Sequence, residues 1–213
     1  MRMDKRFVIT IGRQFGSGGR EIGKLLSEKL RVKYYDKEIL MKAANSIGLN
    51  LSFFEKADER APNFLSNLFS FNMGYNSEPY FIGSTPLSDD NIYRAQSDVM
   101  NALADESSCI IVGRSADYVL RNHPCCISVF IHASMEARID RIIRRGDCLT
   151  KDEARTLAEK KNKLRSNYYN FYTNKIWGDA ASYDLTIDSS KISSDAVTNI
   201  IIEYLNARQN SPF

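Results

Sequence analysis

Histidine and cysteine are scarce in this chain of 213 residues, which has two histidines and four cysteines. No two cysteines form a C-x-x-C pair, and three lie in or beside apolar, strand-like runs. Cysteines in this setting are typical of buried free thiols rather than of a disulfide framework or a zinc site. We therefore assign no side chain as a metal ligand. The four cysteines are Cys109, Cys125, Cys126 and Cys148.

Long apolar runs are also missing, because no stretch approaches the roughly 20 residues that a helix needs to cross a bilayer. Residues 1–6 are charged and lead directly into a predicted strand, which is unlike a secretory signal. We expect a cytoplasmic protein without a membrane partner. The composition, 43% hydrophobic and 26% charged, is that of an ordinary globular domain.

A strong net charge is the third absence. The formal charge is only +3, which is too small to indicate a nucleic-acid partner. The basic excess is local, because residues 134–175 hold eleven Lys/Arg against six Asp/Glu, a net of +5. This segment is predicted to be helical. A local helical cluster of positive charge suits a small polyanionic ligand better than nucleic acid.

Short apolar runs alternate with amphipathic stretches along the chain, and this alternation predicts a parallel sheet with helices on both faces. The runs are nearly continuous rather than alternating, as buried parallel strands are. Predicted strands occupy residues 6–11, 32–35, 109–113, 126–131 and 183–188. Predicted helices occupy residues 18–30, 36–47, 51–60, 92–105, 115–121, 134–145, 150–172 and 194–208. We expect one α/β domain over residues 1–213, built on a parallel five-stranded sheet.

Residues 61–90 have no clean hydrophobic period and are rich in Asn, Ser, Gly, Pro and aromatic residues. A loop of this length inside a compact domain is usually functional or disordered, and the aromatic residues argue against plain disorder. We expect an ordered aromatic flap or part of a substrate subdomain. A dimer contact is an equally open role, so a homodimer is possible. The aromatic residues are Phe64, Phe69, Phe71, Tyr75, Tyr80 and Phe81.

A glycine-rich stretch joins the first predicted strand to the first helix. Glycines let the backbone approach an anion, and the first amides of the helix hold its charge, so this order predicts a phosphate-binding loop. The usual phosphate-loop pattern is not met, because Gly19 stands where a lysine belongs and Glu21 where a magnesium-binding hydroxyl belongs. A plain strand-to-helix turn is the alternative. The candidate phosphate-binding residues are Gly12, Arg13, Gly16, Ser17, Gly18, Gly19, Arg20 and Glu21.

Polar residues follow other predicted strands at their carboxyl ends, where ligands bind in open parallel sheets. Arg114 directly follows a buried strand and can contact a phosphate in bidentate fashion, or form a salt bridge instead. Asp36 follows the second strand and either caps a helix or contacts an acceptor or a metal-bound water.

Arginines cluster on two consecutive predicted helices. Arg138, Arg141 and Arg145 share one helix face by their spacing, and Arg165 lies on the following helix. Most charge runs form a solvated outer face, and this alternative fits Arg144 best. Phosphoryl transfer needs positive charge around the transferring group more than a nucleophilic side chain, so these arginines suit that chemistry.

Several motifs resemble those of the cytidylate kinase-like family, a branch of the nucleoside monophosphate kinases among the P-loop NTPases. The resemblance covers nearly the whole chain and is weakest over residues 61–90. The motifs are GRQFGSGGRE (12–21), IVGRSADY (111–118), RIDRI (138–142), NKLRSNYY (162–169) and WGDAASYDL (177–185).

This resemblance implies an adenylate-kinase-like fold in which residues 134–175 form a helical lid over the nucleotide. It implies ATP and Mg²⁺ as cofactors and a nucleoside monophosphate, CMP or dCMP, as the acceptor of the γ-phosphoryl group. Arg20, Arg141 and Arg165 would be the catalytic residues, and Asp36 and Arg114 would bind the acceptor. Asn162 stands where we expect an aspartate. Because the loop lacks its lysine, a catalytically impaired nucleotide sensor is the alternative function.

Overall fold

The computed structural model describes residues 6–36 and 89–210. The chain divides into two compact units, of which the first comprises residues 1–37 and 100–213 and the second residues 38–99. The second unit is described only over residues 89–99, the first part of helix α5 (Asp89–Glu106). The helices expected over 36–47 and 51–60 lie outside the described residues beyond Asp36, and so does the aromatic flap before residue 89. The roles proposed for the flap therefore stay predictions.

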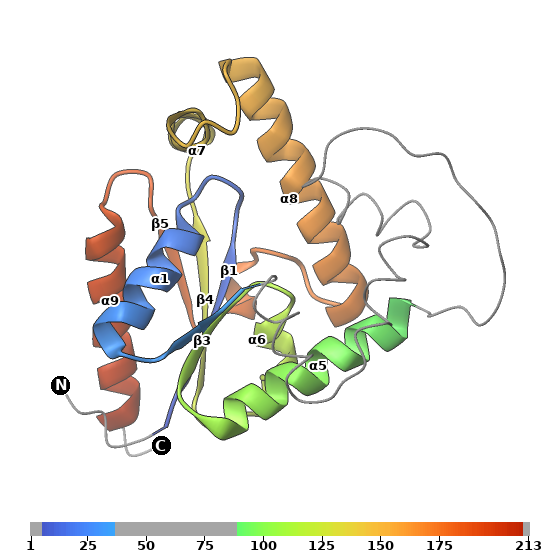
Figure 1. Cartoon of the computed structure of the whole chain (residues 1–213), viewed down its shortest axis with the longest axis vertical. Helices are drawn as coiled ribbons and strands as arrows, with labels where there is room; N and C mark the ends of the chain where they lie inside the picture. Colours follow the sequence, from blue (N-terminus) through green and yellow to red (C-terminus); the bar gives the residue numbers. More distant parts are fainter. Residues whose placement is uncertain (1–5, 37–88, 211–213) are drawn as a thin grey trace, which may run out of the picture. The chain divides into compact units, whose positions relative to one another are not determined.

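The first unit is built on a parallel five-stranded sheet, as predicted (Figure 1). The strand order is β2-β3-β1-β4-β5, so β1 lies in the middle, between β3 and β4. Ile11 of β1 pairs with Val112 on one side and Val129 on the other. The strands are β1 (Val8–Arg13), β2 (Lys33–Tyr35), β3 (Cys109–Val112), β4 (Cys126–His132) and β5 (Leu185–Asp188).

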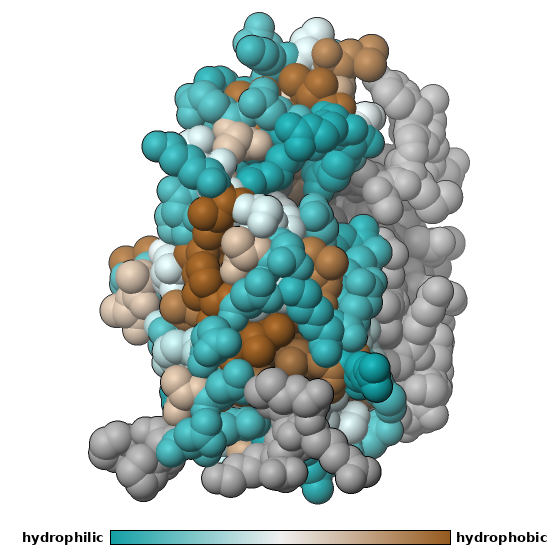
Figure 2. All heavy atoms as spheres, turned by 90° about the vertical axis from the view of Figure 1, so that its left-hand side faces the viewer, coloured by the Kyte–Doolittle hydropathy of each residue, from teal (hydrophilic) through white to brown (hydrophobic). Residues whose placement is uncertain are grey.

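Two helices, α1 (Gly19–Leu30) and α9 (Ser194–Asn210), lie side by side over one face of the sheet (Figure 1). Alternate strand residues point to that face because of the pleat. There they form the main core with apolar residues of both helices, all at most 8% exposed. The outer surface seen from this side is mixed, with apolar patches between hydrophilic ones (Figure 2). Burial of a continuous aliphatic face explains why these helices form where the sequence predicts them.

The opposite face of the sheet carries the short helix α6 (Ala116–Val119) and a small aromatic cluster. Phe130 of β4 contacts Trp177 and Tyr183 there, with ring centroids 5.3 and 4.9 Å away. A short 3₁₀ helix (Ala180–Ser182) precedes β5, which begins at Leu185 rather than at Tyr183 as expected. Tyr183 packs against Phe130 with its ring instead of extending the strand.

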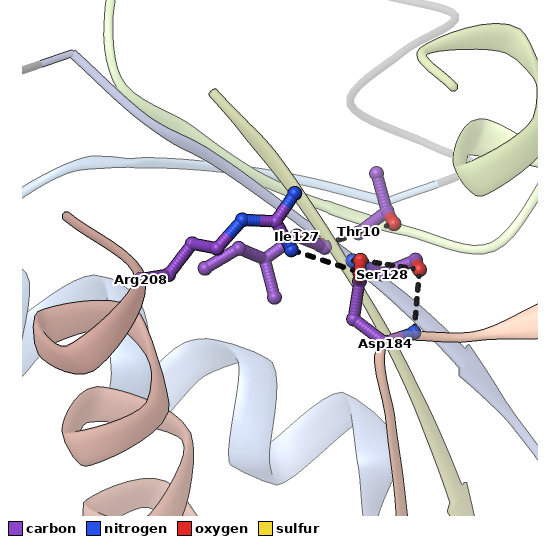
Figure 3. A network of polar contacts seen from close by, with 5 residues as sticks. All are labelled: Thr10, Ile127, Ser128, Asp184 and Arg208. Atoms are coloured by element: carbon purple, nitrogen blue, oxygen red, sulfur yellow. Dashed lines mark hydrogen bonds and ion pairs between the residues drawn. The ribbon is translucent and has the colours of Figure 1, made fainter. Parts of the chain in front are cut away.

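A polar network fixes β5 against β4 away from the carboxyl ends of the strands (Figure 3). The carboxylate of Asp184 accepts hydrogen bonds from the amide and the hydroxyl of Ser128, both at 2.8 Å. Arg208 of α9 donates to the same carboxylate at 3.1 Å, and Thr10 of β1 donates to the carbonyl of Ile127 at 3.3 Å. The last strand and the last helix are thus joined to the centre of the sheet.

Two further helices, α7 (Met135–Arg144) and α8 (Lys151–Thr173), form a pair beyond the carboxyl edge of the sheet (Figure 1). We call them the helix pair. Ser134 caps α7 by accepting a hydrogen bond from the amide of Ala137, and Thr150 and Glu153 form the predicted capping box of α8. The expected break between the helices is confirmed. The pair has its own small core, which consists of Ile139, Ile142, Ala154 and Ala158. In the part of the chain that the structure describes, no helix combines the length and the apolarity needed to span a bilayer.

Candidate phosphate-binding site

The glycine-rich loop follows β1 at the carboxyl edge of the sheet and leads into α1. Gly16 and Gly18 have φ values of +81° and +82°, in the left-handed region that favours glycine. A side chain on Gly16 would also meet the Arg138 carbonyl oxygen at 2.9 Å. The loop therefore needs glycine at position 16 for two reasons, its dihedral angle and its close contact with α7.

Hydrogen bonds within the loop and from the ends of β4 and β5 hold the loop in shape. Both the amide and the hydroxyl of Ser17 donate to the Gln14 carbonyl oxygen, at 3.3 and 2.9 Å. The amide of Ala133 donates to the side-chain oxygen of Gln14 at 3.1 Å, and Ser189 donates its hydroxyl to the Ser17 carbonyl at 2.7 Å. Ser17 is fully buried, so its hydroxyl supports the loop and does not face a ligand.

Several backbone amides of the loop are free donors. Among the described residues, the amides of Gly16, Gly18, Gly19 and Glu21 have no hydrogen-bond acceptor. They lie in the loop and in the first turn of α1, where the helix dipole adds partial positive charge. Successive free amides of this kind form an anion-binding nest. This arrangement fits the predicted phosphate-binding loop.

Arg13 occupies the space that a lysine side chain at position 19 would need. The Cβ of Arg13 lies 2.6 Å from where a Cβ on Gly19 would stand, and Nη1 of Arg13 lies 1.9 Å from where one on Gly113 would stand. The side chain thus crosses Gly19 and ends over Gly113. The two glycines leave room for this path, which no motif in the sequence indicates.

Arg13 and Arg165 are brought together at the loop. Nη1 of Arg165 donates to the Arg13 carbonyl oxygen at 3.0 Å. Burial lowers the pKa of Arg13 to about 10, with a further contribution from nearby Arg114, and burial together with Arg13 and Arg145 lowers the pKa of Arg165 well below its usual value. Within the described residues, neither Arg13 nor Arg165 forms an ion pair. Desolvated guanidinium groups favour the binding of an anion, although the charge of Asp36 partly offsets the effect at Arg13.

The arginines of α7 are not equivalent. Arg141 donates to the Ser189 carbonyl at 2.5 Å and to the Gly16 carbonyl at 3.5 Å, so it contacts the loop from behind. Arg145 is exposed and pairs with Asp147. Arg138 was expected on the same face but is only 6% exposed, because its backbone packs against the bare Gly16. Its Nε and Nη1 atoms have no hydrogen-bond partner in the described part of the chain.

The predicted acceptor residues lie at the ends of β2 and β3. Asp36 is buried and forms a 3.0 Å ion pair with Arg20, whose side chain is 57% exposed. The hydroxyl of Tyr34 also donates to Asp36, at 3.3 Å. Arg20 therefore extends from the phosphate loop toward Asp36 and joins the two predicted subsites. The helix that Asp36 is expected to cap lies outside the described residues.

The turn after β3 holds the other predicted acceptor residue, Arg114. Gly113, Arg114 and Ser115 have φ values of +89°, +59° and +55°, three left-handed residues in succession. Such conformations are costly for residues with side chains and are concentrated at functional sites. The Arg114 guanidinium lies 5.7 Å from the ring centre of Tyr168 on α8. The turn thus directs Arg114 toward the helix pair and away from the sheet.

Phe15 and Asn162 are site residues that sequence reasoning did not assign. The side-chain oxygen of Asn162 on α8 accepts a hydrogen bond from the Phe15 amide at 2.8 Å. Phe15 belongs to the loop, but its ring packs against the small core of the helix pair. The one sequence signal was Asn162 itself, which replaces the aspartate expected before Lys163.

Comparisons with known proteins show which family the chain resembles. The model of the cytidylate kinase-like family matches residues 8–191. The chain is 27% identical to a cytidylate kinase of Pyrococcus furiosus, over 91% of this chain and 85% of that protein, and 27% identical to one of Methanococcus aeolicus, over 91% and 94%.

Solved structures show the same fold. An uncharacterized protein from Eubacterium ventriosum superposes with a TM-score of 0.70 at 27% identity, covering 94% of this chain and 99% of that one. A shikimate kinase from Acinetobacter baumannii superposes with a TM-score of 0.52 at 12% identity, covering 98% and 97%. The chain has the P-loop kinase fold of the adenylate-kinase-like class, as expected.

Proposed function

Because the chain belongs to the cytidylate kinase-like family, we propose that it transfers the γ-phosphoryl group of ATP to a nucleoside monophosphate, CMP or dCMP. One observation carries the proposal. Free loop amides lie next to the Arg13 side chain, which passes over Gly19, and Arg165 donates a hydrogen bond to the Arg13 carbonyl. This combination of fixed dipoles and fixed positive charge is what phosphoryl transfer requires.

The residues divide into donor and acceptor roles. The amides of residues 16–21 and the Arg13 guanidinium would hold the donor phosphates, with Arg13 supplying the charge that the absent lysine would supply elsewhere. Arg114 and Asp36 would bind the acceptor. Arg165 would stabilise the charge on the transferring group, whereas Arg141 would act largely by holding the loop.

The residues present also fit Mg²⁺. Magnesium is usually bound by one or two carboxylates together with substrate phosphates and water. Glu21 offers one exposed carboxylate at the start of α1, beside the free amides. In the described ranges, no group of three acidic, histidine or cysteine side chains forms a separate metal site. Magnesium bound with the nucleotide would neutralise phosphate charge and relieve the repulsion between Glu21 and the phosphates.

A catalytically impaired nucleotide sensor is the second candidate. Gly19 in place of the lysine favours it, and so does the ion pair that engages Arg20 with Asp36. Arg20 would then be unable to reach the phosphates without breaking that pair. Both candidates require the same nucleotide site. A homodimer and a cytoplasmic location are further expectations under either function.

A coupled assay with ATP, magnesium and a panel of CMP, dCMP, UMP and AMP separates the two functions. The kinase proposal expects turnover with CMP or dCMP above that with AMP. No turnover with any acceptor, together with a higher melting temperature in ATP, would establish the sensor. If ATP and magnesium change neither turnover nor melting temperature, both functions are wrong.

A pair of variants tests the roles within the site. We expect Arg20→Ala to weaken ATP binding several-fold more than Arg144→Ala, because Arg20 lies in the first turn of α1 beside the free amides and could exchange Asp36 for a phosphate, whereas Arg144 is exposed on α7. Calorimetric titration measures both. Equal effects would show that Arg20 does not bind the donor phosphates. The roles proposed for the amides and Arg13 would be unaffected.

A further inference from the structure

Phe15 connects the phosphate loop with the helix pair through its side chain. The ring packs against the core formed by Ile139, Ile142, Ala154 and Ala158, although residue 15 lies between the loop residues Gln14 and Gly16. The guanidinium groups of Arg145 and Arg165 lie 5.2 and 5.5 Å from its ring centre. Both distances are within the range of cation–π attraction. One aromatic side chain of the loop is therefore held by both helices of the pair.

The backbone of the loop is held at three points by the same helices. The amide of Phe15 donates to Asn162 at 2.8 Å, the carbonyl of Arg13 accepts from Arg165 at 3.0 Å, and the carbonyl of Gly16 accepts from Arg141 at 3.5 Å. These contacts use one amide and two carbonyls. They leave the free amides of the loop available.

We propose that Phe15 and Asn162 are positioning residues that hold the phosphate loop in its anion-binding shape through the helix pair. This inference rests on the proposed function, since it assigns them to the nucleotide-phosphate site. Neither side chain needs to touch the phosphate. Binding of phosphate and docking of α8 against the loop would then be linked, so that each favours the other to the same extent.

The chemistry of Asn162 supports this role. An amide oxygen accepts the Phe15 hydrogen bond without charge, whereas an aspartate at the same place would accept it with a negative charge. That charge would lie beside the phosphate-binding amides and oppose an anion. An asparagine is therefore the better acceptor for a residue that holds the loop and makes no contact with a ligand hydroxyl or cation.

The test compares pyrophosphate and ATP affinity of the full chain by calorimetry for Phe15→Ala, Asn162→Ala and a matched control, Leu157→Ala. Leu157 packs against the same small core as Phe15 but lies in α8, outside the loop. We expect the two positioning variants to raise the dissociation constant about tenfold, which corresponds to the loss of a buried hydrogen bond or an ordered contact. We expect Leu157→Ala to raise it less than about threefold, whatever it does to stability.

Hydrogen exchange of the Phe15 amide provides a second readout that simple packing would not change. In the wild type we expect pyrophosphate to slow this exchange, and in Asn162→Ala we expect no such slowing. Asn162→Asp should keep the slow exchange of the free protein yet weaken pyrophosphate binding, because only the charge changes. These two variants carry the test if Phe15→Ala does not fold.

Three results would overturn the inference. If folded Phe15→Ala or Asn162→Ala binds pyrophosphate and ATP with wild-type affinity, the positioning role is wrong. The proposed function would not be affected by that result. An equal loss of affinity in Leu157→Ala would show that Phe15 contributes only ordinary core packing. A wild-type protein that binds neither pyrophosphate nor ATP would remove the proposed function and, with it, this inference.

Discussion

The sheet and the helix pair are held together in different ways. The sheet and helices α1 and α9 share a continuous core of large aliphatic side chains, including Ile9 and Ile110, which are fully buried. The helix pair buries two isoleucines and two alanines, and its core is completed by Phe15 from the phosphate loop. Apolar burial is the main source of folding free energy, so we infer that the sheet carries most of the stability.

The two regions also differ in charge. None of the five described strands carries a cluster of charged residues, whereas the segment of the helix pair has a net charge of +5. Arg138 of the pair is buried, Arg165 donates to the Arg13 carbonyl of the loop, and burial lowers the pKa of both. A small core and desolvated cations are unfavourable for stability taken alone. They are explained if the pair serves to place positive charge around a bound anion.

The largest expected effect compares one isoleucine in each region. Ile110 and Ile142 are both fully buried. We expect Ile110→Ala to lower the free energy of unfolding by about 4 kcal/mol, because the rigid sheet cannot close the cavity, and Ile142→Ala by about 2 kcal/mol. Urea denaturation measures both values. A larger loss for Ile142 would contradict the view that the sheet carries the stability.

The next effect concerns the contact between the regions, at Gly16. Gly16 and Gly146 have nearly equal φ values, +81° and +80°, but a side chain on Gly146 would meet nothing within 4 Å. Gly146→Ala should cost about 1 kcal/mol for its left-handed backbone alone. Gly16→Ala should cost about 3 kcal/mol, because its Cβ would also displace α7. Equal losses would show that the contact between Gly16 and Arg138 is not tight.

A smaller effect is expected at the start of α8. Removal of the Thr150 hydroxyl breaks one half of the capping box, so Thr150→Ala should cost about 1 kcal/mol. We expect faster hydrogen exchange in the first turns of α8 and unchanged exchange in β1 and β3. Faster exchange throughout the sheet would mean that the two regions unfold as one unit and that the comparison fails.

The smallest effect is a pH dependence at Asp117 of α6, which accepts a 2.8 Å hydrogen bond from Tyr169 of α8. Burial raises the pKa of Asp117 above its value in the unfolded chain. The folded state then binds more protons from about pH 4 up to that raised pKa, so this carboxyl lowers stability as the pH rises through the window. Asp117→Asn should remove that loss and keep the hydrogen bond.

Chemical denaturation of wild type and Asp117→Asn between pH 4 and pH 7 provides the check. The difference between the two proteins should grow in favour of the variant as the pH rises. A constant difference would show that Asp117 is already ionised at the lower end of the window.

Much of the fold could be predicted from local patterns. The apolar runs, the strand-to-helix glycine loop and the Thr150–Glu153 capping box each depend on residues close together in the chain, and the structure confirms them. The parallel sheet followed from the same runs, because strands separated by helices pair in parallel. The start of β5 was predicted two residues early, since the sequence did not reveal that Tyr183 packs against Phe130.

The sequence by itself determined that glycines and arginines would meet at the carboxyl edge of a parallel sheet. Only the tertiary structure decided which of them face an anion. Arg13 crosses Gly19 to reach Gly113, Arg138 is buried behind Gly16, and Phe15 leaves its loop for the core of the helix pair. Each of these positions depends on the shape left by a residue far away in the chain. A pattern of neighbours cannot contain that information, because packing is decided by volume and distance in space.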